Sequence, residues 1–340
     1  MTWVAWRQQR IVIGLFAVAA VLLIWWAVSS GLHEQSLWHQ YLGPPCHNGR
    51  GVSYKKLAFC RSLYNEVHGL LSHNYLLSDF AQFFGLVMGV VLGVTAIASE
   101  LERKTVRLAW TQSLTRTRWL VAKTSVGLVS IVVLIVPLSV TFSWWVGASR
   151  IGPRIQPTAY PLAGWLLGVY AVSIFILTMF LGALIRRAGP TVAVVVLVII
   201  ATSLFMTAEG RTRLVPIHTA TTTFRTVTKG DFSTAVPKGG APTNSWILFS
   251  GFAPIGTHTI PGEADQRRSD ERMSRCESTS GANSGTVMNS CLRREGLRDV
   301  SFYVADHEFW QLQLREGGLY LTLDLLLFGG TVVLLRRIRV

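Results

Sequence analysis

Six apolar windows, almost free of charge, constrain this 340-residue chain more than any other feature. An α-helix needs about 20 apolar residues to cross the hydrocarbon core of a bilayer. Only 15% of the chain is charged, whereas soluble globular proteins carry about 25%. We therefore expect an all-α polytopic membrane protein with six transmembrane helices. The windows are Ile11–Ser29, Phe80–Ala98, Thr124–Val146, Pro161–Ile185, Pro190–Thr207 and Gly317–Leu335.

The windows divide the chain into parts of different composition. A short inner interfacial segment precedes the spans, polar segments separate them, and a long polar region lies between the fifth and the sixth. The expected parts are residues 1–10 (interfacial), 11–207 (helices one to five, with an outer loop at 31–78 and a basic cytoplasmic loop at 99–123), 208–316 (extracellular) and 317–340 (helix six and a cytoplasmic tail).

Basic residues gather at the ends of the apolar windows. The net charge is +14, which in a soluble chain would suggest a nucleic-acid partner. This distribution instead indicates orientation in a membrane, with lipids as partners. If the N-terminus is inside, the short inner segments hold the basic excess, including Arg186, Arg187 and Arg336. We therefore expect a multi-pass protein with both termini cytoplasmic and no nucleic-acid partner.

The four cysteines give an independent indication of the same orientation. All of them fall in segments that the charge rule places outside, where an oxidising environment allows disulfides to form. Three connectivities are possible, and we favour Cys46–Cys60 and Cys276–Cys291 because each pair closes a short loop within one segment. Four free thiols are the alternative. A metal site is disfavoured because the sequence has no CxxC.

The two long outer segments differ in character. Lys55–Leu77 has apolar residues at roughly helical spacing, so we expect an amphipathic helix that leads into the second span. Gly210–Gly285 is rich in Thr, Ser, Gly and Pro. We expect it to be partly flexible and ordered by the Cys276–Cys291 loop. Trp246–Pro254 is an apolar patch inside it, which is compatible with a segment that dips towards the bilayer.

The basic loop between spans two and three carries the most functional information. Helix-forming residues follow Glu100, Thr111–Ser113 interrupts them, and a second amphipathic stretch leads to Lys123. Such a loop is typical of a short helix on the membrane face that presents charges and hydroxyls to a cytosolic partner. An anchor that contacts only lipid headgroups is the alternative, and the residues alone do not decide between the two.

This loop resembles that of ABC-2 class transporter permeases, actinobacterial members in particular. The resemblance is carried by acids just past span two, a Thr shortly after them, Thr/Ser-Arg pairs and a Lys that opens span three. The six-span layout and the tail Phe309–Gln311 with Glu316 are similar to the same group, whereas Lys104 departs from it because a Gly is common there. The matching residues are Glu100, Glu102, Thr105, Arg107–Ser113, Thr115–Trp119 and Lys123.

The resemblance implies the membrane-spanning half of an ABC exporter in a bacterial plasma membrane. In this family two permeases, here expected as a homodimer, work with two ABC ATPase subunits, and the inner loop is the coupling helix that docks on the ATPase. The cargo suggested by the group is a hydrophobic or amphipathic drug, antibiotic or peptide. The implied coupling residues are Glu100, Glu102, Arg103, Thr105, Arg107, Thr111, Gln112, Ser113, Arg116 and Arg118.

The sequence itself contains no nucleotide-binding or catalytic motif. GxxxxGK followed by Ser or Thr is absent, so ATP and Mg²⁺ are expected on the partner and no cofactor on this chain. GxSxG and HExxH are absent too, which disfavours an intramembrane enzyme and leaves no catalytic residue to name. The eight histidines match no zinc-binding spacing, so no metal site is expected. A non-transporting sensor, with a ligand-binding outer region and a signalling loop, stays open as an alternative.

Two features within the spans are candidate functional residues. Gly85, Gly89 and Gly93 recur every fourth residue, a pattern that lets helix backbones approach closely in lipid. That contact lies either within one subunit or at a dimer axis or substrate path. Asp324 is the one acid well inside a window, and an intramembrane carboxyl is a candidate substrate site. The alternative, which we favour, is a neutral or hydrogen-bonded carboxyl that faces an outer vestibule.

Overall fold

The chain divides into a membrane-spanning part and a smaller part that contains a β-sheet. The computed structural model describes residues 2–42, 46, 54–103, 115–150, 152–229, 232–279 and 285–337. Contacts among these residues separate two compact units. We call them the spanning unit (Met1–Arg211 and Leu312–Val340) and the sheet unit (Thr212–Gln311).

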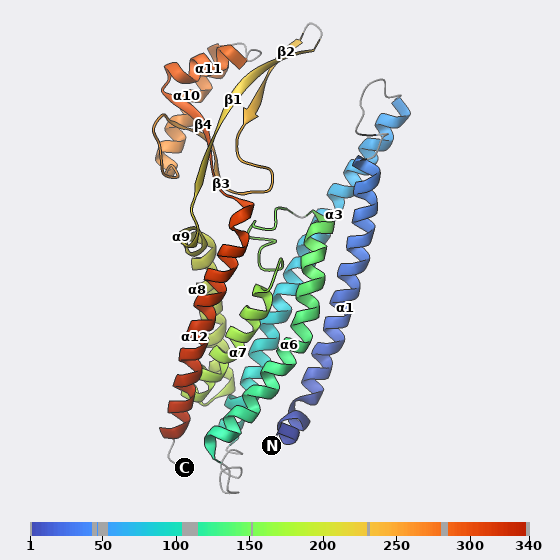
Figure 1. The fold of residues 1–340 in the computed structure, drawn as a ribbon, viewed down its shortest axis with the longest axis vertical. Helices are drawn as coiled ribbons and strands as arrows, with labels where there is room; N and C mark the ends of the chain where they lie inside the picture. Colours follow the sequence, from blue (N-terminus) through green and yellow to red (C-terminus); the bar gives the residue numbers. More distant parts are fainter. Residues whose placement is uncertain are drawn as a thin grey trace. The chain divides into compact units, whose positions relative to one another are not determined.

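Long helices build the spanning unit (Figure 1). The π-helices η1 (Val94–Ala98) and η2 (Met206–Gly210) continue two of them, and the single turns α4 (Ser99–Glu102) and α9 (Arg211–Leu214) follow. Within the described ranges, six helices are long and apolar enough to cross a membrane, which confirms the predicted number of spans. The long helices are α1 (Thr2–Leu42), α3 (Tyr54–Gly93), α6 (Arg116–Ser149), α7 (Leu166–Ile185), α8 (Ala188–Phe205) and α12 (Phe309–Arg337).

The segment expected to be a polar outer loop, residues 31–78, is largely helical. It forms the last part of α1 and the first part of α3, so the amphipathic helix expected over Lys55–Leu77 is continuous with the second span. α1 has 41 residues, and at 1.5 Å per residue such a helix is about 60 Å long, twice the thickness of the hydrocarbon core. Both helices therefore continue beyond any bilayer that their apolar windows span.

Contacts between α1 and α3 explain why these extensions stay helical. Leu37 and Leu63 are buried against each other. The amide of Asn74 donates a 2.9 Å hydrogen bond to the carboxylate of Glu34, and both side chains are buried. The predicted disulfide Cys46–Cys60 then links a residue shortly after the end of α1 to the first part of α3. The pair thus has its own small core and a covalent link.

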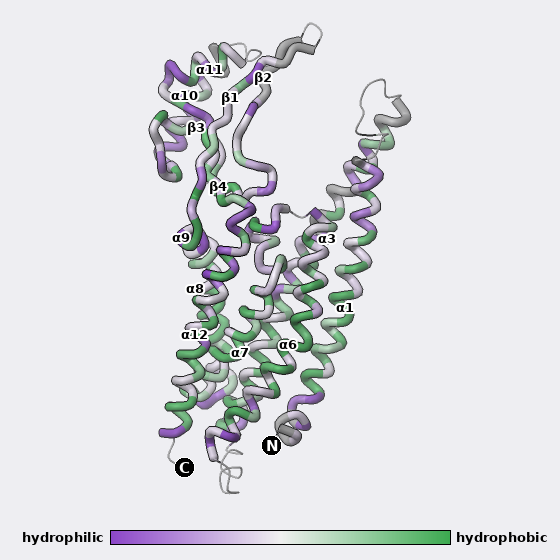
Figure 2. Tube along the Cα trace, viewed as in Figure 1, coloured by the Kyte–Doolittle hydropathy of each residue, from purple (hydrophilic) through white to green (hydrophobic). Residues whose placement is uncertain are grey.

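α7 is the central helix of the spanning unit. Over its apolar window 56% of the residues are buried, compared with 17% for the windows of α1, α8 and α12. Figure 2 shows that the helices of this unit are mostly hydrophobic along their middle parts and hydrophilic towards their ends. Helices that stay apolar on their exposed sides are suited to lipid rather than water. α1, α8 and α12 therefore present the lipid-facing surfaces, and α7 forms the core.

The basic ends of the helices lie together at one end of the spanning unit. There α7 ends at Ile185, Arg186 adopts a left-handed φ of 59°, and α8 begins at Ala188. Pro190 sits in the first turn of α8, where its missing N–H leaves no hydrogen bond unmade. Arg186 and Arg187 thus form a tight turn between the two helices. We refer to this end, where α3 finishes, α6 begins and α12 finishes, as the basic end.

The sheet unit contains a four-stranded antiparallel sheet in its described part. Its strand order is β2-β1-β4-β3, and His218 pairs with Tyr303 where β1 meets β4. Thr dominates β1, and β-branched residues of this kind favour strands because they pack well on a pleated surface. The strands are β1 (His218–Lys229), β2 (Phe232–Gly239), β3 (Trp246–Pro254) and β4 (Leu297–Val304).

Two helices complete the sheet unit where a partly flexible region was expected. α10 (Glu263–Thr279) and α11 (Gly285–Arg294) pack through Met273, Cys276, Met288 and Leu292 onto Leu297 of β4, with Phe224 and Phe252 of the sheet beside them. The predicted disulfide Cys276–Cys291 joins the two helices. Order thus comes from a sheet-and-helix core and not from the disulfide alone.

The apolar patch Trp246–Pro254 forms the strand β3, whose Ala253 is buried beside Val300 and Phe302 of β4. The predicted bounds of this region need correction. The unit boundaries, Thr212 and Gln311, fall slightly inside the predicted region 208–316, and α12 starts at Phe309 rather than at residue 317. Polar and charged residues alternate with apolar ones in its first turns, so hydropathy alone placed the start of the helix too late.

Candidate transport cavity and coupling elements

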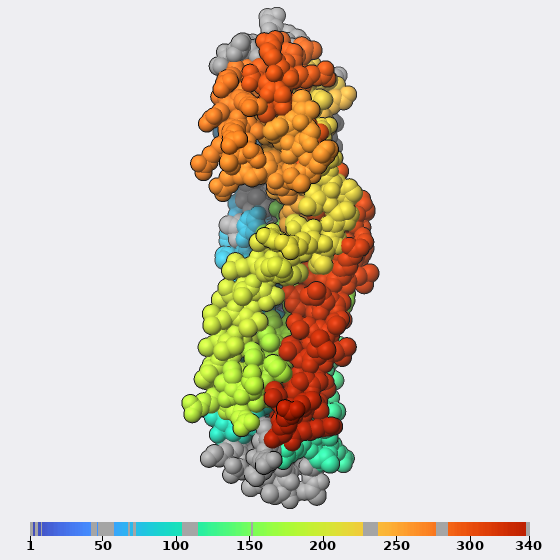
Figure 3. Space-filling view, turned by 90° about the vertical axis from the view of Figure 1, so that its left-hand side faces the viewer, coloured from blue at the N-terminus to red at the C-terminus, as the bar shows by residue number. Residues whose placement is uncertain are grey.

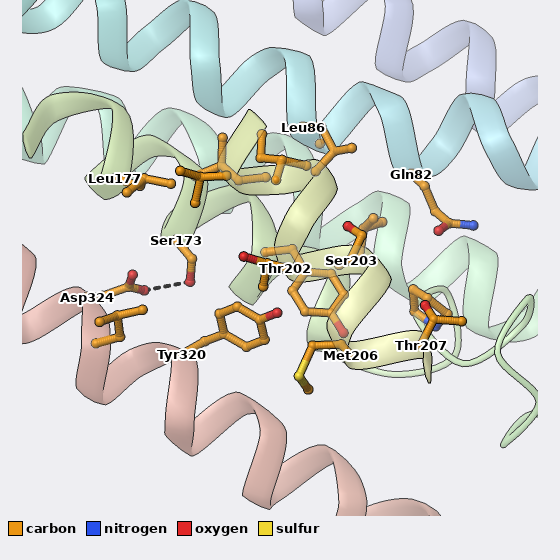
Figure 4. Close-up of a pocket in the computed structure, with 18 of the residues that line it drawn as sticks. Gln82, Leu86, Ser173, Leu177, Thr202, Ser203, Met206, Thr207, Tyr320 and Asp324 are labelled. Carbon is orange, nitrogen blue, oxygen red and sulfur yellow. Dashed lines mark hydrogen bonds between the residues drawn. The ribbon is translucent and has the colours of Figure 1, made fainter. Parts of the chain in front are cut away.

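A cavity of about 250 Å³ lies inside the spanning unit, between α3, α7, α8 and α12. Figure 3 shows α8 and α12 next to each other along one face of this unit. Most of the lining is apolar, with Leu86, Leu177 and Met206 among the lining residues, while Gln82, Thr202, Ser203 and Thr207 add polar groups (Figure 4). An apolar cavity with a few convergent polar groups is the usual form of a small-molecule site.

Asp324 of α12 supplies the carboxylate of this cavity. Its side chain points towards α7, where the hydroxyl of Ser173 donates a 2.8 Å hydrogen bond to Oδ2 (Figure 4). The residue is only 6% exposed, and Oδ1 is buried without a hydrogen-bond partner among the described residues. A buried acceptor left unsatisfied is energetically costly, so this oxygen is a group that a bound donor or cation would satisfy. Asp324 is therefore a hydrogen-bonded carboxyl that lines a cavity between helices.

A buried polar cluster forms the cavity wall at the end opposite the basic end. Arg211 Nε lies 3.3 Å from Glu316 Oε2, and the hydroxyl of Tyr170 donates a 2.6 Å hydrogen bond to Glu316 Oε1. Arg211 also lies 4.8 Å from the ring centre of Tyr160. Burial and the nearby Glu316 raise the pKa of Tyr160 well above its ordinary value, so its phenol stays protonated. Charge and hydrogen bonds thus tie α7, α9 and α12 together here.

Gln313 fixes the start of α12 to the segment that precedes α7. Its amide donates to the carbonyls of Tyr160 and Ala163, and its Oε1 accepts a 3.3 Å hydrogen bond from the N–H of Trp165. Gly164 between them has a φ of +110°, a conformation that side chains with a Cβ rarely adopt. The whole Gln313 side chain is buried, which gives α12 a fixed attachment beside the cavity.

The glycine stripe of α3 packs against α7 of the same chain. A Cβ on Gly89 would lie 2.7 Å from the carbonyl oxygen of Ala171, and one on Gly93 would lie 2.6 Å from Cβ of Thr178. Gly85 is in looser contact with Leu167 and Ala171, at 3.7 Å. The stripe thus packs against α7 within the subunit, where all three glycines are buried. Gly85 also lines the cavity.

At the basic end, an ion pair joins the two sides of the predicted coupling loop. Lys123 Nζ lies 2.5 Å from Glu100 Oε1, and both side chains are largely buried. The pair holds the start of α4 against α6, where the loop leaves one helix and enters the next. Glu100 and Lys123 therefore have a structural partner in each other, which the sequence-based reasoning did not predict.

Two other loop residues contact the helices that line the cavity. Oε2 of Glu102 accepts a 2.8 Å hydrogen bond from the N–H of Ala188, the first residue of α8. Nη1 of Arg116 donates to the carbonyls of Leu335 and Arg336, in the last turn of α12, at 3.0 and 3.1 Å. These bonds satisfy helix-terminal groups that have no partner within their own helix. They also connect the loop directly to α8 and α12.

The other predicted coupling residues fall into two groups. Arg103 and Arg118 are exposed at the basic end. Thr105, Arg107, Thr111, Gln112 and Ser113 lie outside the described residues.

Several residues around the cavity were not singled out from the sequence. Ser173 and Tyr170 lie on α7 and Arg211 lies on α9, and their partners are 105 to 151 residues away along the chain. A polar residue within an apolar run is a weak signal, because most such residues bond to their own helix. The charge of Arg211 immediately after an apolar window was the one signal available for the cluster.

The fold and the cavity define a polytopic membrane protein of the permease type. A comparison with protein families matches residues 12–211 to the family described as ABC-2 membrane transporter related. The match covers more than half of the chain, and the chain belongs to this family. It is a membrane component of a transporter, in a family whose permeases normally pair with an ATPase subunit. Comparisons with curated proteins and with solved structures give no significant match.

Proposed function

We propose that this chain is the membrane-spanning subunit of an ATP-driven exporter for a hydrophobic or amphipathic molecule. The drug, antibiotic or peptide would occupy the cavity between α3, α7, α8 and α12. The observation that carries the proposal is the unsatisfied Oδ1 of Asp324 in that mostly apolar cavity. A positively charged or hydrogen-bond-donating group on an otherwise apolar cargo suits this arrangement, and intramembrane carboxylates mark substrate paths in many transporters.

The contacts at the basic end support a role of the Glu100–Arg118 loop in coupling. Glu102 bonds to the start of α8 and Arg116 to the end of α12, and both helices line the cavity. A displacement of the loop by an ATPase would therefore act on two cavity walls. Arg103 and Arg118, which are exposed, are the side chains that would meet the ATPase. ATP and Mg²⁺ would bind to that partner.

We place the basic end in the cytoplasm. Basic residues at this end satisfy the positive-inside rule. The disulfide Cys46–Cys60 joins the opposite ends of α1 and α3, and disulfides persist in oxidising compartments. Both chain termini then lie on the cytoplasmic side of a bacterial plasma membrane.

The working unit would contain two permeases, as the family implies, most simply two copies of this chain. The glycine stripe Gly85–Gly93 is not their contact, because α7 of the same chain covers it. The helix α1 offers a more suitable surface, since Leu15, Val18 and Leu22 are exposed along it. Cysteine crosslinking along this face tests the dimer, and a set that gives no crosslinked homodimer contradicts it.

Uptake into inside-out vesicles tests the cargo class. The chain is expressed with its ATPase, and the probe is a fluorescent lipophilic cation such as rhodamine 6G. We expect ATP-dependent accumulation of the cation in vesicles with the wild-type chain. Asp324→Asn removes the charge but keeps the shape, and it should lower this accumulation at least about tenfold. A loss of this size matches the free-energy cost of leaving a buried polar group unpaired. Asp79→Asn, which alters an exposed carboxylate on α3, is the matched control and keeps full transport.

Two outcomes contradict this assignment. If Asp324→Asn transports the cation as well as the wild type, the carboxylate does not bind cargo. If the cation binds and alters ATP hydrolysis but never accumulates in vesicles, the sensor alternative is the better description.

A further inference from the structure

Three side chains of metal-binding type converge within the sheet unit. His218 is the first residue of β1, and His307 and Glu308 lie in the 3₁₀ turn η3 (Asp306–Glu308). Glu308 Oε1 lies 3.6 Å from Nε2 of His218 and 3.2 Å from Nε2 of His307. The three ligand atoms all lie within 4.8 Å of one another. The residues are far apart in the sequence, so no spacing motif reveals them.

These separations fit a small metal ion. Zinc binds imidazole nitrogen and carboxylate oxygen at about 2.0–2.2 Å in tetrahedral geometry, which sets neighbouring ligand atoms about 3.4 Å apart. The two histidine–glutamate separations lie on either side of that value. The remaining adjustment falls to His307, whose side chain is 73% exposed.

Hydrogen bonding accounts for only part of the arrangement, because Nε2 of His307 lies within hydrogen-bond distance of Glu308 Oε1 but Nε2 of His218 does not. Nε2 of His218 is buried and has no hydrogen-bond partner among the described residues. Its 3.6 Å separation from Glu308 Oε1 is too long for a hydrogen bond. Glu308 itself is only 6% exposed. A buried nitrogen lone pair facing a buried carboxylate is the arrangement that a shared cation stabilises.

The backbone around the cluster holds two of the ligands in place. His218 pairs with Tyr303 in the β1–β4 ladder, and the two rings lie 5.7 Å apart. The N–H of Glu308 donates a 3.0 Å hydrogen bond to the carbonyl of Ala305. A site with fixed ligands binds a metal more tightly because less freedom is lost on binding.

We propose that His218, His307 and Glu308 bind a divalent transition-metal ion, with Zn²⁺ as its representative. Two imidazoles and one carboxylate are ligands that such ions accept, and the exposed side of His307 leaves a fourth position for water. The ion would join the start of β1 to η3. Along the chain, β1 follows the fifth span and η3 precedes the sixth. The proposal departs from the sequence-based expectation of no metal site.

Zinc titration of the purified full chain tests this site. The protein carries no polyhistidine tag, is stripped with a chelator, and is titrated with Zn²⁺ against a chromogenic competitor. We expect each chain to bind one Zn²⁺ ion tightly. His218→Ala and Glu308→Gln should each lower the Zn²⁺ affinity at least about tenfold, because each removes a direct ligand. His258→Ala removes an exposed histidine of the same unit and should leave the affinity unchanged.

A spectroscopic readout keeps the test independent of the variants' stability. Co²⁺ in place of Zn²⁺ should give the visible absorption bands of a four- or five-coordinate ion bound by nitrogen and oxygen. Absence of these bands in the wild-type chain, or equal Zn²⁺ affinity in the wild type and a correctly folded His218→Ala/His307→Ala variant, overturns the proposal.

Discussion

Arg211 and Glu316 form an ion pair inside the spanning unit, with Nε and Oε2 3.3 Å apart and the Glu316 side chain fully buried. Arg211 follows the fifth span and Glu316 lies near the start of the sixth. The hydroxyl of Tyr170 bonds to both partners. The pair therefore connects three helical elements through charge, at the end of the cavity opposite the predicted ATPase contact.

Removing the charge of Glu316 should destabilise the protein strongly. Glu316→Gln leaves Arg211 buried without its counter-charge, a loss that typically costs about 3–5 kcal/mol. We expect a large drop in the thermal unfolding temperature of the detergent-solubilised chain. Tyr170→Phe leaves the ion pair in place but removes two hydrogen bonds to charged groups, each worth about 1.5–3 kcal/mol.

The double substitution Arg211→Met/Glu316→Leu provides the control for that prediction. Because both charges are removed, it should be less destabilising than Glu316→Gln alone. A Glu316→Gln variant that unfolds at the wild-type temperature contradicts the assigned ion pair.

The contact between α3 and α7 depends on the absence of a side chain at Gly89. A Cβ there would lie 2.7 Å from the carbonyl oxygen of Ala171 and 3.0 Å from Cγ2 of Ile174. Overpacking of this kind costs about 1–3 kcal/mol, so Gly89→Leu should lower the unfolding temperature and the yield of folded protein. Gly14→Leu is the matched control because nothing lies within 4 Å of a Cβ at that position. Equal stability of the two variants contradicts the packing described for the stripe.

The stability of the sheet unit should depend on the protonation of Asp299. Burial raises the pKa of this carboxyl, while its hydrogen bond with Thr222 acts in the opposite direction. An acid with a raised pKa binds its proton more tightly in the folded state. Stability should therefore be highest below the ordinary aspartate value of about 3.9 and fall as the pH rises through the folded-state pKa.

Asp299→Asn tests this pH dependence. Asparagine does not ionise, so the variant should lack this loss of stability. The unfolding temperature of the variant minus that of the wild type should therefore increase with pH across this range. An unchanged difference between the two proteins from pH 3.5 to pH 7 argues against the effect.

The disulfide Cys276–Cys291 should stabilise the sheet unit specifically. It closes a separation of 15 residues, and a loop of this size corresponds to about 3 kcal/mol of stabilisation. Replacing both cysteines with Ser should speed amide hydrogen exchange in α10 and α11. Replacing Cys46 and Cys60, which lie in the spanning unit, should leave this exchange unchanged. Equal effects of the two double replacements would show that the disulfide does not act locally.

The same cysteines report the orientation. In intact cells, a membrane-impermeant reductant followed by an impermeant maleimide should label all four positions. Labelling that requires permeabilised cells contradicts a cytoplasmic basic end.

Local sequence patterns were sufficient to predict the spans and the two disulfide pairings. Each depends on an apolar run or on residues close together in the chain. The sheet was not predicted as a whole, because β1 and β3 both pair with β4, which lies beyond two helices in the sequence, and only the β1–β2 hairpin is local. Arg211 and Glu316 are 105 residues apart, so no local pattern links them. Asp324 was found from its charge alone, whereas its partner Ser173 was not.

Affinity purification of the full chain in mild detergent tests the central claim, that this permease works with an ATPase docked at the basic end. We predict that an ATP-hydrolysing subunit with a Walker A motif co-purifies in equal amount with the permease. Arg103→Ala/Arg118→Ala should weaken its retention, whereas Arg61→Ala, at the opposite end of α3, should not. A permease that purifies without ATPase activity, or that retains the ATPase equally in all three forms, contradicts the account.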